Sequence, residues 1–138
     1  VTPRRSLTVD LLHAVFLGIL NVWGRIAIWK LLMCGCNGAH GTQTETLRAG
    51  VLVLRSLLMT WYPEHQSEHN DDLTRVADLT VKMVGKQDDP KLKTKGAETW
   101  GISLFLIEQL RHFHHMLGSD GDRILIAGEM LEQIVRSW

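Results

Sequence analysis

The stretch TVDLLHAVFLGILNVWGRIAIWKLLM, residues 8–33, decides the fold class of this chain. Its apolar residues recur at intervals of three and four, which is the period of one face of an α-helix. The stretch ends at CGCNGAHG, residues 34–41, where three glycines cannot sustain a helix. The sequence therefore predicts a long first helix.

Residues 8–33 are also apolar enough to suggest a membrane span. Five polar or charged residues interrupt them: Asp10, His13, Asn21, Arg25 and Lys30. A charge at the centre of a bilayer is costly, and the longest uncharged piece, 14–24, has only eleven residues. That piece is too short to cross a bilayer. We therefore expect a buried helix and no transmembrane span, in a setting that still allows association with a membrane.

Four further segments have helical character, at about 44–61, 72–85, 97–117 and 119–138. Pro63, Gly85 and Gly118 are expected to end the first three of these. The apolar runs GVLVLRSLL and RILIAG would also fit buried strands, but the segments that contain them are long, and this length favours helix. The sequence therefore predicts a single all-α domain over residues 1–138, with about five amphipathic helices packed around one core.

Composition says little about partners, because 15 basic and 15 acidic residues balance in the 138-residue chain. The two cysteines, Cys34 and Cys36, are too close to form an unstrained disulfide. The opening residues VTPRRSLTVD show no secretory leader. We expect an intracellular, reducing compartment and a chain that is either complete or a fragment of a longer one.

Cys34, Cys36 and His40 provide three soft metal ligands within seven residues. A structural zinc site needs a fourth ligand and a wider gap between the cysteines. Only a distant histidine, such as His65 or His69, is available for the fourth position. We therefore expect two thiols at a helix end and no bound metal.

The segment EQLRHFHHM adds a second group of histidines, at residues 112, 114 and 115. Glu108 precedes His112 by one helical turn, and Glu129 and Glu132 lie in the last helix. Carboxylate-bridged dimetal bundles need a Glu and a His three apart on each of two helices. That pattern is absent from the sequence, so we interpret these residues as a solvated helix face.

The segment KMVGKQDDPKLKTKG holds the main concentration of basic residues. They are Lys82, Lys86, Lys91, Lys93 and Lys95. Such a run can contact several phosphates, although two aspartates dilute it and a charge run is usually a solvated loop. It is the candidate nucleic-acid-binding segment of the chain.

Three residues have two competing interpretations. Asp10 lies in the first turn of the expected first helix, where free amide hydrogens stabilise a carboxylate. His13 lies one turn further on and can hydrogen-bond to Asp10, and Glu98 starts its own helix in the same way. Elementary helix chemistry therefore explains all three, and the alternative is a catalytic role.

Two short motifs resemble CACTA-type (En/Spm-like) DNA transposases. DLLH, residues 10–13, is similar to the D-x-x-H-x-x-x-L-G motif that opens a helical insertion in those proteins. KGAETW, residues 95–100, is similar to their later K-A-x-E-W stretch, which starts another helix. The chain departs from the family pattern because Gly96 interrupts the second motif, Trp100 follows Glu98 by two residues, and the upstream strands are missing.

The resemblance implies a catalytic role for Asp10, His13 and Glu98, with Mg²⁺ as cofactor, DNA as partner and the nucleus as location. Such transposases use an acidic triad on an RNase H-like sheet to hold metal ions for attack on a phosphodiester bond. A chain with at most two of those acids cannot assemble the site alone. We therefore expect the helical part of a transposase-derived protein, without enzymatic activity in isolation and without a cofactor of its own.

A function of another class is left open. The chain has five tryptophans in 138 residues, and tryptophan is a favoured anchor at protein interfaces. The alternative is therefore a small helical subunit or adaptor that docks, through apolar and Trp-bearing helix faces, into a larger assembly, either membrane-associated or not.

Overall fold

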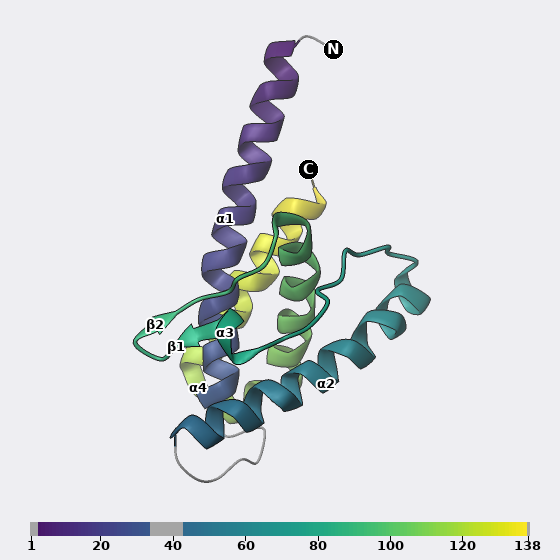
Figure 1. Cartoon of the computed structure of the whole chain (residues 1–138). Helices are drawn as coiled ribbons and strands as arrows, with labels where there is room; N and C mark the ends of the chain where they lie inside the picture. Colours follow the sequence, from purple (N-terminus) through teal and green to yellow (C-terminus); the bar gives the residue numbers. More distant parts are fainter. Residues whose placement is uncertain (1–2, 34–42, 138) are drawn as a thin grey trace.

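The computed structural model describes the backbone of residues 3–33 and 43–137, and the side chains of residues 14–33 and 45–137. These residues form four helices and one short hairpin (Figure 1). The elements are α1 (Pro3–Met33), α2 (Gln43–His69), α3 (Val81–Val84), β1 (Gly85–Lys86), β2 (Asp89–Pro90) and α4 (Gly96–Arg136). The all-α prediction is confirmed, with four helices in the described residues in place of about five.

The second helix is longer than expected. Pro63 was predicted to end it, and instead lies inside α2, which continues to His69. The turn beyond Pro63 packs well, because His65 is buried and its ring stacks on the ring of Trp61 with centroids 4.5 Å apart. This packing offsets the backbone hydrogen bond that proline cannot donate. The helix ends at His69. The next residue, Asn70, has a φ of 51°, which lies in the left-handed region that asparagine tolerates.

The third expected helix, at about 72–85, is wrong over most of its length. Residues 70–80 form an irregular segment, called the strap here, and only Val81–Val84 is helical. The strap takes its hydrogen bonds from elsewhere: the Val76 N–H donates to the Tyr62 hydroxyl oxygen at 3.2 Å. The Leu79 N–H donates to the side chain of the preceding aspartate at 2.8 Å. These side-chain acceptors compete with the helical ladder.

The expected fourth and fifth helices form one element, α4, with a kink at Gly118. Gly118 has φ 71° and ψ −164°, which a side chain would strain. The chain therefore changes direction at the predicted glycine, and the helical parts on either side of it together form α4. Gly85, with φ 77°, ends α3 as expected.

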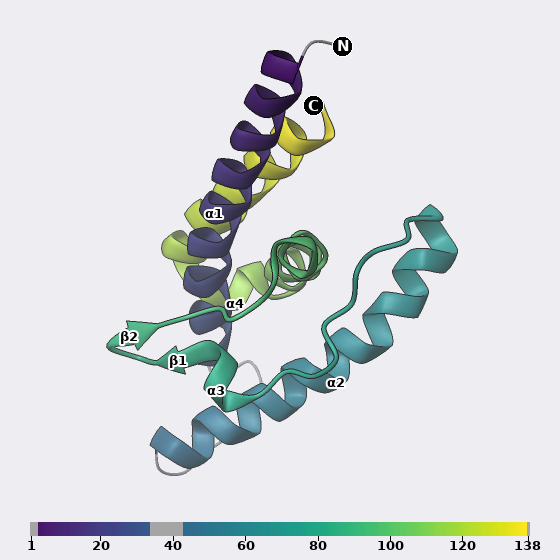
Figure 2. The same ribbon diagram turned by 45° about the horizontal axis from the view of Figure 1, so that its top comes forward.

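Helix α1 packs along the second half of α4, as two views show (Figures 1 and 2). The Trp23 Nε1–H donates to the Ile124 carbonyl oxygen at 2.9 Å. Gly128 lies directly under the Trp23 ring, so that any side chain there would collide with the indole. A glycine on α4 therefore sets how closely the two helices approach.

Two further side chains of α1 hold the segment that precedes α4. Trp29 Nε1–H donates to the Val84 carbonyl oxygen at 2.7 Å, beside the hairpin. Asn21 Nδ2–H donates to the Leu92 carbonyl oxygen at 2.7 Å. Helix α1 therefore connects the hairpin and the start of α4 through side-chain to backbone hydrogen bonds.

The first half of α4 is buried on every side over residues 101–107. It is covered by α1, α2 and the strap, and the buried apolar side chains of the described residues, apart from Leu20, form one cluster. Helix α2 faces this cluster with an apolar stripe at helical spacing, because Val51, Leu54 and Leu58 are buried in it.

Several apolar residues of the first and last helices are exposed. On α1, Val15, Ile19 and Ile26 follow the three- and four-residue period of the sequence and are 54%, 45% and 50% exposed. On α4, Ile134 is 47% exposed. The cause is the apolar character of α1 around its whole circumference, which does not single out the side that a neighbour covers.

Residues 14–33 of α1 are long and apolar enough to cross a membrane by length and composition. Of that window, 44% is buried inside the molecule. The core helix of a soluble protein satisfies the same criterion, so the length and composition of α1 fit either setting.

Candidate functional site

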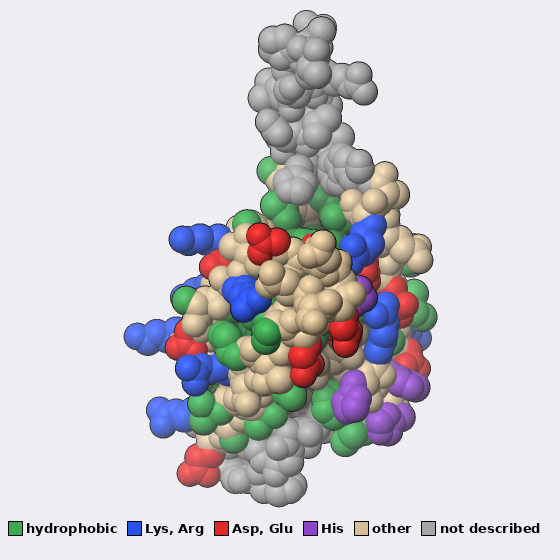
Figure 3. Space-filling model, turned by 90° about the vertical axis from the view of Figure 1, so that its right-hand side faces the viewer, with side chains coloured by type: hydrophobic (Ala, Val, Ile, Leu, Met, Phe, Trp, Pro, Cys, Tyr) green, Lys and Arg blue, Asp and Glu red, His purple; other side chains and the backbone are tan. Residues whose placement is uncertain are grey.

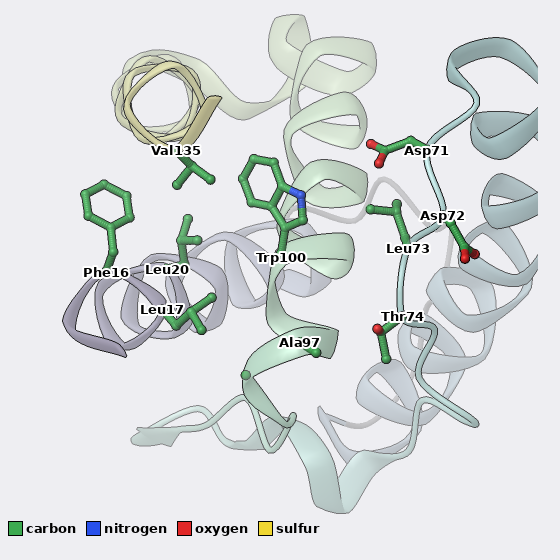
Figure 4. A pocket seen from close by; sticks show the side chains of 11 residues that line it. Phe16, Leu17, Leu20, Asp71, Asp72, Leu73, Thr74, Ala97, Trp100 and Val135 are labelled. Carbon is green, nitrogen blue, oxygen red and sulfur yellow. The ribbon is translucent and has the colours of Figure 1, made fainter. Parts of the chain in front are cut away.

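A half-open pocket of about 390 Å³ lies where α1, the strap and both ends of α4 meet (Figure 4). Helix α1 contributes apolar side chains to it, α4 contributes Trp100, and the strap contributes two carboxylates. The lining residues are Phe16, Leu17, Leu20, Asp71, Asp72, Leu73, Thr74, Gly96, Ala97, Trp100 and Val135. The pocket therefore has an apolar wall opposite an acidic edge.

The acidic edge is held in place from α2. Asp71 Oδ2 lies 3.2 Å from Nε2 of His65, which is itself buried against Trp61. The sequence analysis missed this pair, because no motif or spacing links His65 to Asp71. The contact depends on the chain reversing at Asn70, which periodicity does not reveal.

The other edge of the pocket is the start of α4, where Glu98 lies. The Lys95 N–H donates to Glu98 Oε1 at 2.8 Å, and the Thr99 hydroxyl donates to the Lys95 carbonyl oxygen at 2.9 Å. This is the capping arrangement expected for a glutamate in the first helical turn. One carboxylate oxygen of Glu98 therefore has a structural partner.

The segment that follows DLLH lies against the start of the KGAETW segment at this pocket. Leu17, seven residues after Asp10, lies so close to Gly96 that a methyl group added there would be 3.2 Å from Leu17 Cδ1. Glu98 follows Gly96 by two residues. Asp10 and His13 belong to α1, and their side chains lie outside the described residues. The structure thus brings the segment around Leu17 and the segment around Gly96 together, while the Asp10 carboxylate lies outside the described residues.

Among the described residues, no group of three His, Cys, Asp or Glu side chains could hold a metal ion. Cys34, Cys36 and His40 lie outside this part of the chain. Glu108 and Glu129 have protein partners, since Glu108 accepts the indole N–H of a tryptophan and Glu129 accepts from Arg111 at 3.4 Å.

The predicted nucleic-acid-binding lysines surround the hairpin. All five, Lys82, Lys86, Lys91, Lys93 and Lys95, are exposed. Lys91 Nζ is 3.5 Å from a carboxylate oxygen of Asp89. In the face drawn in Figure 3, Lys and Arg side chains follow one edge with carboxylates among them. The lysines are accessible to phosphate, and acidic neighbours reduce the positive potential.

Tyr62 is a buried titratable group of α2 that contacts the strap. Burial raises the pKa of Tyr62 above its ordinary value of 10.0, and the nearby Glu98 charge raises it further. The Val76 N–H and the Arg75 guanidinium, which lies 5.5 Å above the Tyr62 ring, act in the opposite direction on this pKa. Tyr62 is therefore a protonated, structural hydroxyl at neutral pH.

Comparison with known proteins gives no relative: no family model, curated protein or solved structure matches this chain. The resemblance to transposases consequently depends on the two short motifs, at residues 10–13 and 95–100. Function must be inferred from the pocket, the lysines and the exposed surface of the chain itself.

Proposed function

We propose that this chain is the helical part of a CACTA-type, transposase-derived protein, without catalytic activity of its own. The observation that supports the proposal is the contact between Leu17 and Gly96 at the pocket. It places the segment that follows DLLH against the segment that contains Glu98, although about eighty residues separate them in the sequence.

The proposal assigns Asp10 and Glu98 to a larger acidic set. In-line attack on a phosphodiester bond uses metal ions about 4 Å apart, held by several carboxylates. Glu98 retains one oxygen beyond its capping hydrogen bond to the Lys95 N–H. The remaining carboxylates would come from another part of a longer protein, with Mg²⁺ and DNA bound there and the nucleus as the place of action.

The decisive experiment uses the longest protein encoded in frame with this chain. We expect the upstream sequence to encode strands that end in aspartates, and the long protein to nick DNA in the presence of Mg²⁺. Asp10→Asn and Glu98→Gln should each abolish nicking. Glu64→Gln, at an exposed position of α2, is the matched control and should retain it. Activity that survives Glu98→Gln would contradict the proposal.

A second candidate function, docking into a larger assembly, is favoured by exposed aliphatic residues on two helices. Val15, Ile19 and Ile26 of α1, and Ile126 and Met130 of α4, are each 45–59% exposed. Trp23, Trp29 and Trp61 do not form this surface, since each is no more than 8% exposed. Apolar surface of this kind marks interaction sites.

A further inference from the structure

Four side chains of α1 form a continuous apolar row on its outer side, called the α1 row here. They are Val15, Ile19, Val22 and Ile26, with exposed fractions of 54%, 45%, 44% and 50%. Their spacings of four, three and four residues are those of the a and d positions of a heptad. Met33 follows seven residues after Ile26 and is 37% exposed.

The opposite side of the same helix is fully packed. Leu20, Ala27 and Leu31 are no more than 4% exposed, and Trp23 is fixed by its hydrogen bond to the Ile124 carbonyl. The α1 row is therefore not the loose surface of a poorly packed helix. A helix that is apolar around its circumference is normally covered on every side, and in the described part of this chain the row remains exposed.

Charge identifies what would cover the α1 row. Arg25 and Lys30 flank it on opposite sides, at the positions that form interhelical ion pairs in coiled coils. Residues 14–33 contain no Asp or Glu. Arg25 and Lys30 have no ion-pair partner among the described residues. Two copies of the row facing each other would bring like charges together, whereas an acidic helix would be complementary.

We propose that the α1 row is a docking seam for an α-helix of a partner protein, one with an apolar heptad row flanked by Glu or Asp. The inference rests on the docking function given above and names its surface and the chemistry of the partner. It adds a seam on the side of α1 that faces away from the packed core.

A groove of about 510 Å³ extends the seam toward the end of α1. The groove is lined by Ile26, Trp29, Lys30 and Met33 of α1, by Gln87 of the hairpin, and by Asp120, Arg123 and Ile124 of α4. Trp29 is immobilised by its hydrogen bond to the Val84 carbonyl oxygen at 2.7 Å. A preformed groove with an apolar wall and charged side chains beside it suits one large side chain of the partner, as in the central anchors of protein interfaces.

The test uses two synthetic helical peptides as probes for the partner. Both have about four heptads with Ile and Leu at a and d, and they differ only at e and g, with Glu in one and Lys in the other. Fluorescence anisotropy of the labelled peptides is measured against the whole chain. We expect the Glu peptide to bind at least roughly tenfold tighter than the Lys peptide, with affinity that falls as salt is raised.

Matched variants locate the binding. Ile19→Glu is expected to weaken Glu-peptide binding by roughly tenfold or more, because it places a charge in the seam. Leu52→Glu, at an exposed apolar position of α2 (61% exposed), should change it by less than about twofold. Ile19→Ser is the milder second variant, and circular dichroism melting of every variant verifies folding.

Several outcomes would overturn the seam. If both peptides bind with equal affinity, or if neither binds, the row does not select an acidic helix and the proposal is wrong. A concentration-dependent dimer in sedimentation velocity that Ile19→Glu abolishes would assign the row to a second copy. Pelleting with phosphatidylserine-containing vesicles that Ile19→Glu abolishes would assign it to a membrane. If neither peptide binds and Leu52→Glu disrupts the complex of the chain with its native partner, the docking function stands and only this seam is rejected.

Discussion

Tyr62 links α2 to the strap through one hydroxyl group. Its side chain is 2% exposed, and its oxygen accepts the Val76 N–H at 3.2 Å. Removal of that acceptor leaves a buried N–H without a partner, which costs about 1–3 kcal/mol. The strap has few other backbone hydrogen bonds to α2, so this single contact is important to its position.

We therefore expect Tyr62→Phe to lower the free energy of unfolding by about 1–3 kcal/mol at neutral pH. Urea unfolding followed by circular dichroism would measure it. Thr60→Val, which removes a hydroxyl bonded to the Ser56 carbonyl on the exposed side of α2, is the control and should cost less. An equal loss in both variants would show that burial of the Tyr62 hydroxyl is unimportant.

The raised pKa of Tyr62 also predicts a pH dependence of stability. Because burial raises this pKa in the folded chain above 10.0, the unfolded chain loses the phenolic proton first. The stabilising contribution is complete below pH 10 and is lost as pH rises through the folded pKa. The free energy of unfolding should fall more steeply above about pH 10 in the wild type than in Tyr62→Phe. Because Tyr62 is the sole tyrosine, absorbance titration reports its pKa directly.

Glu98 illustrates how a motif residue can have an ordinary structural role. Its carboxylate accepts the Lys95 N–H at 2.8 Å, and glutamine can accept the same hydrogen bond. Glu98→Gln should therefore cost well under about 1 kcal/mol in urea unfolding, from the lost charge at a helix start. Mg²⁺ or Mn²⁺ should leave the melting temperature of the isolated chain unchanged. A saturable rise that Glu98→Gln abolishes would instead show a metal site in this chain alone.

At the scale of elements, the kink of α4 depends on one glycine. Gly118 has φ 71° and ψ −164°, a conformation available almost only to glycine. The kink allows the second half of α4 to turn back along α1, where Gly128 faces Trp23. The direction of half a helix is thus fixed by a single backbone position.

Two glycines of this chain form a matched test of that conclusion. A methyl group at Gly118 or at Gly18 would have no atom within 4 Å, so the two sites differ in backbone conformation and not in space. Gly118→Ala should lower the free energy of unfolding by about 1–3 kcal/mol. Gly18→Ala, inside the regular helix α1, should raise it by about 0.5–1 kcal/mol. Changes of the same sign in thermal melts would refute the backbone explanation.

At the scale of the whole molecule, α1 contacts nearly every later element. Its side chains bond to Leu92 and Val84 before α4, and to Ile124 within α4. These three hydrogen bonds hold α1 against the later elements and involve no residue between α1 and α2. We therefore predict that a zinc chelator leaves the melting temperature unchanged and that elemental analysis finds no stoichiometric zinc on Cys34 and Cys36. One zinc per chain would contradict this.

The candidate site was predictable only where it depends on local chemistry. The capping role of Glu98 follows from its place in the first turn of a helix. The pairing of Asp71 with His65 was missed, because it requires the strap to fold back onto α2. The exposed face of α1 was also missed, since an all-round apolar sequence gives no sign of which side a neighbour covers.

The sequence by itself determined the features that depend on neighbouring residues: the helical period, the buried stripe of α2, and the breaks at Gly85 and Gly118. Tertiary structure alone decided the continuation of α2 past Pro63, the strap at 70–80, and the uncovered row on α1. The physical reason is competition. Local propensities are worth about 1 kcal/mol per residue or less for most residues, and about 3 kcal/mol for a proline inside a helix. The packing of Trp61 against Phe105 of α4 and the hydrogen bond from the strap to Tyr62 outweigh them once distant segments meet.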